Sequence, residues 1–105
     1  MGFYAHHTII VTTGSIDRSQ QVLDKALKIF SKDEVSRSLV STANGFCTIC
    51  IAPDGSKEGW EESNKGDSRR DILITWLEEN SIYDWVEVRF GGDIEHEGGI
   101  TRSGY

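Results

Sequence analysis

The apolar and polar positions of this chain follow a strand period in some segments and a helix period in others. His6–Thr13 is rich in β-branched residues and is followed by Gly14, which predicts a strand. Asp17 then stands where it could cap a helix. The apolar residues of that helix recur at three-and-four spacing, namely Val22, Leu23, Ala26, Leu27 and Phe30.

A hairpin is predicted in the middle of the chain. Two strand-like runs, Val35–Ala43 and Phe46–Ala52, flank the dipeptide Asn44-Gly45. Asn-Gly is favoured in tight hairpin turns because both central residues must take positive φ. The two runs are therefore expected to pair antiparallel.

A long polar segment, Pro53–Asp67, separates the hairpin from a second helix. It is about 15 residues long, whereas connections in compact domains are usually about 4–6 residues. Asp67 or Ser68 is expected to cap the helix, which ends near Asn80. Trp85–Phe90 alternates like a half-buried strand. The predicted buried stripe of the second helix is Ile72, Leu73, Trp76 and Leu77.

The order β-α-β-β-α-β predicts an α+β fold, a ferredoxin-like βαββαβ sandwich. Two helices would cover one face of a four-stranded antiparallel sheet, with the first and third strands central. Residues 1–93 are expected to form this single domain, and residues 94–105 an acidic, glycine-containing, mobile tail. Exposed edge strands of such a sheet commonly pair across a two-fold axis, so a homodimer or higher oligomer is expected.

The net charge of −6 is concentrated at the C-terminal end. Residues 1–52 carry five basic and four acidic side chains, and residues 78–105 carry two and seven. An acidic surface repels phosphate backbones, which argues against general nucleic-acid binding. No apolar run approaches the roughly 20 residues of a membrane helix, so no membrane association and a cytoplasmic location are expected. The acidic residues of the last third are Glu78, Glu79, Asp84, Glu87, Asp93, Glu95 and Glu97.

The strongest candidate for a ligand site lies around the expected start of the second helix. The first turn of a helix has free N–H groups and a partial positive charge, so arginines there go against the usual preference for acids. An anion bound at this turn would gain N–H donors and bidentate arginine contacts, and a tryptophan face could stack a base. Alternatively, neighbouring carboxylates such as Asp67 and Asp71 neutralise the arginines. The candidate ligand-binding residues are Lys57, Trp60, Ser68, Arg69 and Arg70, with His7 as a further possible contact.

No catalytic set or metal site is predicted. Cys47 and Cys50 form a Cys-x-x-Cys within a predicted strand, where residues three apart point to opposite faces and cannot share a metal. His6 and Thr8 match half of the His-x-Thr/Ser signature of two-histidine phosphodiesterases, which need two copies. The remaining histidine, His96, lacks that pattern. An enzyme is therefore unsupported, and no cofactor is expected.

Several segments resemble a family of small uncharacterised proteins of tailed bacteriophages and prophages. The resemblance is carried by the start His6-His7-x-Ile9-Ile10-Val11-Thr12 and by the loop Pro53-Asp54-Gly55-Ser56-Lys57-Glu58-Gly59-Trp60-Glu61-Glu62-Ser63. It is also carried by Gly66-Asp67 with Arg69-Arg70-Asp71, and by Trp76-Leu77 before Trp85-Val86-Glu87-Val88. It covers roughly residues 6–93. It implies a phage accessory protein acting in an infected bacterial cell, and it brings no catalytic residues with it.

Three hypotheses follow, from different functional classes. The first is a non-enzymatic phage accessory protein that sequesters a small anionic, nucleotide-derived host defence signal. The alternative is an acidic protein-binding inhibitor of a host enzyme, or a nucleic-acid mimic, acting through its acidic end or open sheet face. The third is a phosphodiesterase of a nucleotide messenger that uses His6 or His7.

Overall fold

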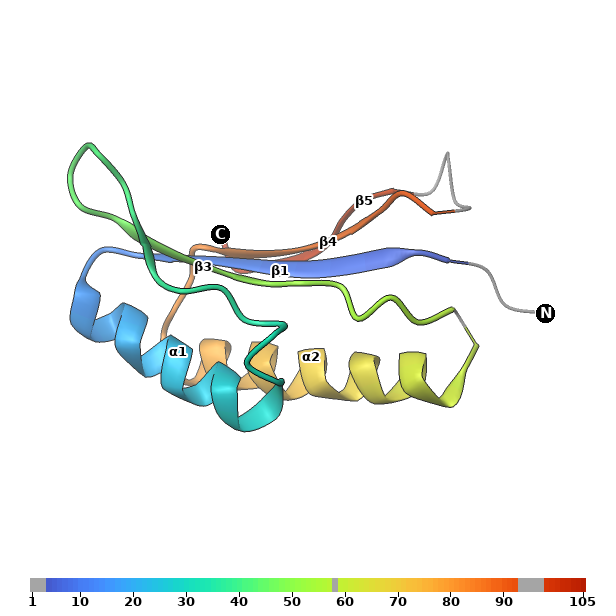
Figure 1. The fold of residues 1–105 in the computed structure, drawn as a ribbon. Helices are drawn as coiled ribbons and strands as arrows, with labels where there is room; N and C mark the ends of the chain where they lie inside the picture. Colours follow the sequence, from blue (N-terminus) through green and yellow to red (C-terminus); the bar gives the residue numbers. More distant parts are fainter. Residues whose placement is uncertain (1–3, 58, 93–97) are drawn as a thin grey trace.

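The computed structural model describes residues 4–57, 59–92 and 98–105 and shows an α+β fold with two helices and a five-stranded antiparallel sheet. Both helices lie on one face of the sheet, and none of the described residues forms a helix on the other face (Figure 1). The elements are β1 (His6–Thr13), α1 (Ile16–Ile29), β2 (Leu39–Val40), β3 (Cys47–Ile51), α2 (Glu61–Glu79), β4 (Trp85–Phe90) and β5 (Gly99–Ser103).

The strands lie in the order β2-β3-β1-β4-β5, and every neighbouring pair is antiparallel. β1 and β3 are interior strands, as predicted. The prediction of four strands is wrong, because β5 adds a fifth strand beside β4. Gly99–Ser103 lies within the segment expected to be a mobile tail, so the chain continues in the sheet beyond the expected domain end.

The core fills the space between the helices and the sheet. Alternate residues of β1, notably Ile9 and Val11, are almost fully buried on the face toward the helices. β4 directs Trp85 and Glu87 to the same side. Burial of this apolar surface is the main term that holds the sandwich together. The buried apolar cluster comprises Ile9, Val11, Val22, Ala26, Phe30, Ile49, Ile51, Leu73, Ile74, Leu77, Ile82 and Trp85.

The first helix is capped two residues earlier than expected. Ser15, and not Asp17, is the N-cap, and its hydroxyl accepts a hydrogen bond from the Arg18 amide at 3.2 Å. Asp17 lies in the first turn, where its negative charge suits the helix dipole. Leu27 was expected in the buried stripe but is exposed, whereas Val22 and Ala26 are buried.

The hairpin around Asn44-Gly45 is confirmed, with a longer loop and a shorter first strand than predicted. Asn44 and Gly45 have φ of 62° and 64°, as the dipeptide requires. The backbone pairing closes at Ser41 and Phe46, so the loop is built of the intervening residues 42–45. Only Leu39–Val40 of the predicted run 35–43 forms a strand with β3.

The second helix begins much earlier than predicted. Trp60 is its N-cap and has no side-chain capping hydrogen bond, so the first turn begins at Glu61. The segment expected to be loop up to Asp67 is helical in its second half. The buried stripe is also rotated, because Ile74 is buried with Leu73 and Leu77 while Ile72 is 51% exposed.

Candidate functional site

The early start of α2 removes the basis of the predicted anion site. Ser68, Arg69 and Arg70 are interior residues of the helix, so their backbone N–H groups bond within it. The true first turn contains Glu61 and Glu62, the charge that a helix start normally prefers. The placement of these arginines at a helix start is therefore wrong.

Arg70 points into the molecule and is already neutralised. Its residue exposure is 9%. Its Nε donates to Glu87 Oε2 on β4 at 3.2 Å, and its terminal NH2 group donates to Asp67 one turn earlier on α2. A guanidinium held between two carboxylates has little left to offer an incoming anion.

Glu87 also forms an ion pair with a second arginine, Arg102 of β5. Arg102 binds it through two parallel hydrogen bonds, Nε to Oε1 at 2.9 Å and a terminal nitrogen to Oε2 at 2.8 Å. Thr101 donates a third, at 2.7 Å. Burial raises the pKa of Glu87, but these hydrogen bonds and the charges of Arg102 and Arg70 outweigh burial and hold the pKa below its ordinary value.

The same ion network fastens the last strand to α2. Arg102 also donates to Asp71 Oδ1 at 2.6 Å, so a chain of alternating charges runs from Asp67 to Asp71 across three elements. The hydrogen bonds that Arg102 donates to Glu87 raise the pKa of Arg102 more than burial lowers it, so the net result is a raised pKa. The network joins α2, β4 and β5 and explains why β5 is part of the sheet.

The loop before α2 docks on that helix through Asp54. Asp54 Oδ1 accepts hydrogen bonds from the Ser56 amide and hydroxyl at 2.9 and 2.7 Å. Its other oxygen lies so close to Gly66 that a Cβ there would stand 2.8 Å from it. Burial raises the pKa of Asp54, but the Ser56 hydrogen bonds and the charges of Arg70 and Arg69 lower it further than burial raises it.

Two of the predicted ligand-binding residues do lie together. The Lys57 ammonium is 5.5 Å from the ring centroid of Trp60 and 5.3 Å from that of Tyr4, both within cation–π range. Trp60 is 49% exposed. The exposed indole and the ammonium therefore form a small cationic, aromatic corner near the start of β1.

The other predicted residues are dispersed. The Ser68 hydroxyl donates to the Asn64 carbonyl oxygen of its own helix at 3.2 Å, so it does not point to a shared site. Arg69 is half-buried on α2. His7 lies on the helix-facing side of β1, opposite Arg89 of β4. The structure thus brings Lys57 and Trp60 together and separates them from the inward-pointing Arg70.

The histidines and cysteines are arranged as the strand period predicts. His6 and His7 lie on opposite faces of β1, and His6 packs against Phe90 with ring centroids 5.5 Å apart. Cys47 is buried on the helix side, whereas Cys50 pairs with Ile10 on the other face, and both are free thiols. His96, and the acidic residues Asp93, Glu95 and Glu97, lie outside the described residues. Within the described ranges, no cluster of three His, Cys, Asp or Glu could hold a metal ion.

A groove that sequence reasoning missed runs between α1 and α2; we call it the α2 groove. Its volume is about 330 Å³. Ile72 and Trp76 provide its apolar surface, and carboxylates flank it. The sequence does not reveal this groove, because helical spacing puts Ile72 in the predicted buried stripe, whereas the structure exposes it. The groove is lined by Lys25, Asp71, Ile72, Thr75, Trp76 and Glu79.

The exposed side of α2 carries more acidic than basic side chains, because Arg70 is turned inward to Asp67 and Glu87. The remaining basic residues of the helix are Lys65, which pairs with Glu61 and Glu62, and the half-buried Arg69. We call the outward carboxylates the acidic α2 surface: Glu61, Glu62, Asp67, Asp71, Glu78 and Glu79.

Among the described residues, no helix is both long and apolar enough to cross a membrane. Comparisons of the chain with protein-family models, with curated proteins and with solved structures find no match. Its function is therefore inferred from the geometry described above.

Proposed function

We propose that this protein is a non-enzymatic accessory protein that binds a basic segment of another protein through α2. The observation that carries the proposal is the α2 groove, an apolar trough flanked by Asp71 and Glu79 on α2 and by Lys25 on α1. Apolar anchors in a groove supply affinity, and complementary charge at the rim supplies specificity and association rate.

The groove has the chemistry that such a segment needs. Ile72 is 51% exposed, and Trp76 lies beside it, half-buried against the core. An apolar side chain or the aliphatic stem of a lysine or arginine could pack there. The cationic ends of its neighbours would then reach Glu79 at the groove or Glu78 beside it, since Asp71 is already bound by Arg102. The same carboxylates would repel the phosphate backbone of a nucleic acid.

A small anionic ligand is the second candidate. Its support is the corner formed by Lys57 and the exposed Trp60, with Arg69 as a further cation on α2. It is the weaker candidate because Arg70, which would have supplied a bidentate contact, is held by Asp67 and Glu87.

We further propose that α1, α2 and β1–β4 form a ferredoxin-like core to which β5 has been added. The neighbour order β2-β3-β1-β4, antiparallel throughout, supports this assignment. In this proposal the basic partner lies in the cytoplasm of an infected bacterium, as the resemblance to small phage proteins would suggest.

The test is a quantitative pull-down from bacterial lysate with three forms of the protein. They are the wild type, the groove variant Ile72→Ala/Glu78→Gln/Glu79→Gln, and the matched charge control Asp17→Asn/Asp33→Asn. The control removes the same number of charges from exposed positions that do not line the groove.

A true partner is retained by the wild type and the control, lost by the groove variant, and released as salt rises. Direct binding of that purified partner should fall about tenfold or more in the groove variant, the combined scale of one apolar anchor and two charge contacts. Equal retention by all three forms would refute the α2 groove. A small anion that binds the wild type and is lost in Lys57→Gln would favour the second candidate.

A further inference from the structure

The sheet face that carries no helix is unusually free of charge; we call it the open face. Strand pairing and alternation place twelve strand side chains on it. Among these described positions none is Asp, Glu, Lys or Arg, although charged residues make up 27% of the chain. The twelve are His6, Thr8, Ile10, Thr12, Leu39, Thr48, Cys50, Val86, Val88, Phe90, Ile100 and Ser103.

Large apolar side chains on this face are exposed. Phe90 is 44% exposed, Ile100 57% and Leu39 40%. A solvent-facing side of an antiparallel sheet normally carries polar and charged residues, and extended exposed apolar patches usually mark an interaction site. The open face is therefore more apolar than solvent contact alone explains.

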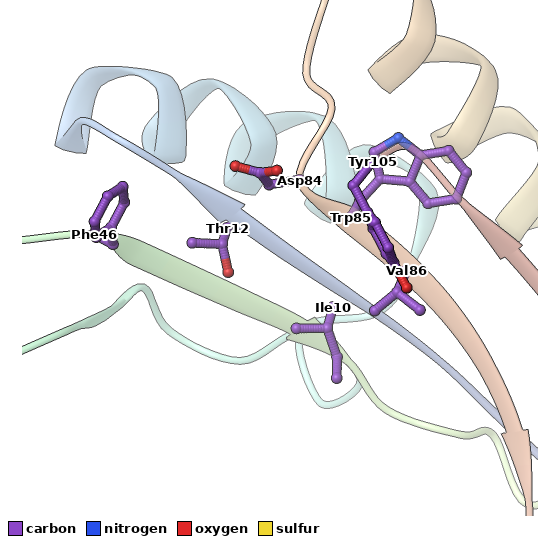
Figure 2. Close-up of a pocket in the computed structure, with 7 residues that line it drawn as sticks. All are labelled: Ile10, Thr12, Phe46, Asp84, Trp85, Val86 and Tyr105. Atoms are coloured by element: carbon purple, nitrogen blue, oxygen red, sulfur yellow. The ribbon is translucent and has the colours of Figure 1, made fainter. Parts of the chain in front are cut away.

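A shallow groove with a volume of about 340 Å³ crosses this face. Ile10 and Val86, which pair across β1 and β4, lie in it, and Phe46 and Tyr105 stand at opposite sides (Figure 2). Both aromatic side chains are exposed, Phe46 by 44% and Tyr105 by 76%. The face thus offers both a recess and projecting rings that could fill one.

The sheet edges are poorly suited to joining two chains. β2 is a strand of two residues, and β5 pairs with β4 through a register shift between Glu87 and Val88. Short and irregular edges are features that hinder strand addition. Association through the edges, which the sequence suggested, is less favoured than association through the open face.

We propose that the open face is covered by a second copy of this chain, packed face to face across a two-fold axis. In such an isologous contact each residue meets the same surface of its partner, so the surface must complement itself. A chain of net charge −6 repels its own copy, and a face whose described strand side chains carry no charge gives the closest approach, although the carboxylate of Asp84 lines its groove. Nucleic acid would instead require lysines and arginines, which the described strand positions of this face lack.

This inference is independent of the proposed function. Both helices cover the opposite face of the sheet, so a face-to-face dimer leaves the α2 groove of each copy outward (Figure 1). The dimer would present two acidic α2 surfaces on its two outer sides.

The experiment is sedimentation equilibrium of the full chain between about 1 and about 200 μM, since an association is read from its concentration dependence. We expect a monomer–dimer equilibrium in the wild type. Ile100→Lys should weaken it about tenfold or more, because each interface would then hold two opposed ammonium groups. The matched control is Ile72→Lys on α2, at 51% exposure against 57% for Ile100, and it should leave the dimer unchanged.

Cys50 supplies a second readout that needs no substitution. It lies on the open face, half-buried, beside Ile10, while Cys47 is buried. Its reaction with a thiol reagent should slow as the protein concentration rises and the dimer forms. Cys50→Ser identifies the signal as that of this thiol.

A wild type that is monomeric throughout this range would overturn the proposal. So would a dimer that both lysine variants leave intact, or one that Ile72→Lys disrupts and Ile100→Lys does not. Cys50 reactivity independent of concentration in a dimer would likewise show that the contact lies elsewhere.

Discussion

Glu87 and Arg70 show, at the scale of single residues, how burial determines the role of a charge. Glu87 is 5% exposed and Arg70 9% exposed, and each would be costly to bury without its partner. Asp67 and Arg102 extend the pair, so every charge in the network has an opposite neighbour. Removing one member of such a network strongly lowers the free energy of unfolding, because it leaves a buried charge without a partner. Replacing the whole network by apolar residues would change the stability much less.

Glu87→Gln should strongly destabilise the protein. The substitution keeps the size of the side chain and removes the charge that Arg70 and Arg102 share. Breaking a buried pair on one side typically costs about 3–5 kcal/mol. Urea denaturation measures this, with Glu78→Gln on the exposed side of α2 as the control, expected within about 0.5 kcal/mol of wild type. Equal stabilities for the two variants would contradict the network's structural role.

The lowered pKa of Glu87 predicts a pH dependence of stability. Because the pKa is lower in the folded than in the unfolded state, the unfolded chain binds the proton more readily. The contribution of Glu87 is therefore fully present above the ordinary carboxyl pKa and is lost as pH falls through the folded value. Thermal unfolding from about pH 6 to about pH 3 should show a smaller loss of Tm in Glu87→Gln than in wild type. An equal loss of Tm with falling pH in both proteins would contradict this prediction.

The residues of the candidate site could be named from sequence, but their directions could not. Successive residues of a helix point about 100° apart, so Arg69 and Arg70 cannot share one orientation. Which of them turns inward depends on Glu87, a residue 17 positions later that β4 directs toward the helices. That pairing is tertiary, and neither local charge nor capping preference contains it.

At the scale of elements, the loop before α2 depends on a glycine inside the helix. Gly66 is buried, and Asp54 packs where its side chain would be. Gly66 costs about 1 kcal/mol of helix propensity relative to alanine. The close approach of the loop to α2 explains why a glycine is nevertheless suited to this position.

Gly66→Ala should therefore release the loop while favouring the helix. An added Cβ would stand 2.8 Å from Asp54 Oδ2, so the carboxylate has to move and its hydrogen bond from the Ser56 amide weakens. Hydrogen exchange of that amide should accelerate about tenfold, the equivalent of one charged hydrogen bond. Gly14→Ala is the control, because nothing lies within 4 Å of its Cβ position. Unchanged exchange at Ser56 would show that the loop does not depend on this contact.

For the elements with strong periodicity, the sequence predicted the correct first and last residues, but for the other elements it did not. β1 and β4 have regular alternation bounded by glycine or by a polar turn, and both occupy the predicted residues. The start of α2 was misplaced because Asp67 and Ser68 look like caps, whereas Trp60 begins the helix without a side-chain cap. β5 was missed because its five residues contain one large apolar side chain, and an ion pair from Arg102 holds it in place.

At the scale of the whole molecule, the two sides of the sheet differ in charge. The helix side carries the acidic α2 surface and the α2 groove, and the open face carries no acidic or basic strand residue among those described. The core and the ion network lie between them. This separation would allow one surface to hold a second copy and the other to meet a basic partner.

The two proposed contacts should therefore respond to salt in opposite directions. Screening weakens attraction between α2 carboxylates and a basic partner, and it also weakens repulsion between two copies that each carry a charge of −6. Raising salt from about 50 mM to about 500 mM, which shortens the screening length roughly threefold, should release the partner and tighten the dimer. Pull-down and sedimentation of the same preparation measure both. If both contacts weakened together, the dimer would depend on ionic attraction, and the uncharged strand side chains of the open face could not form its interface.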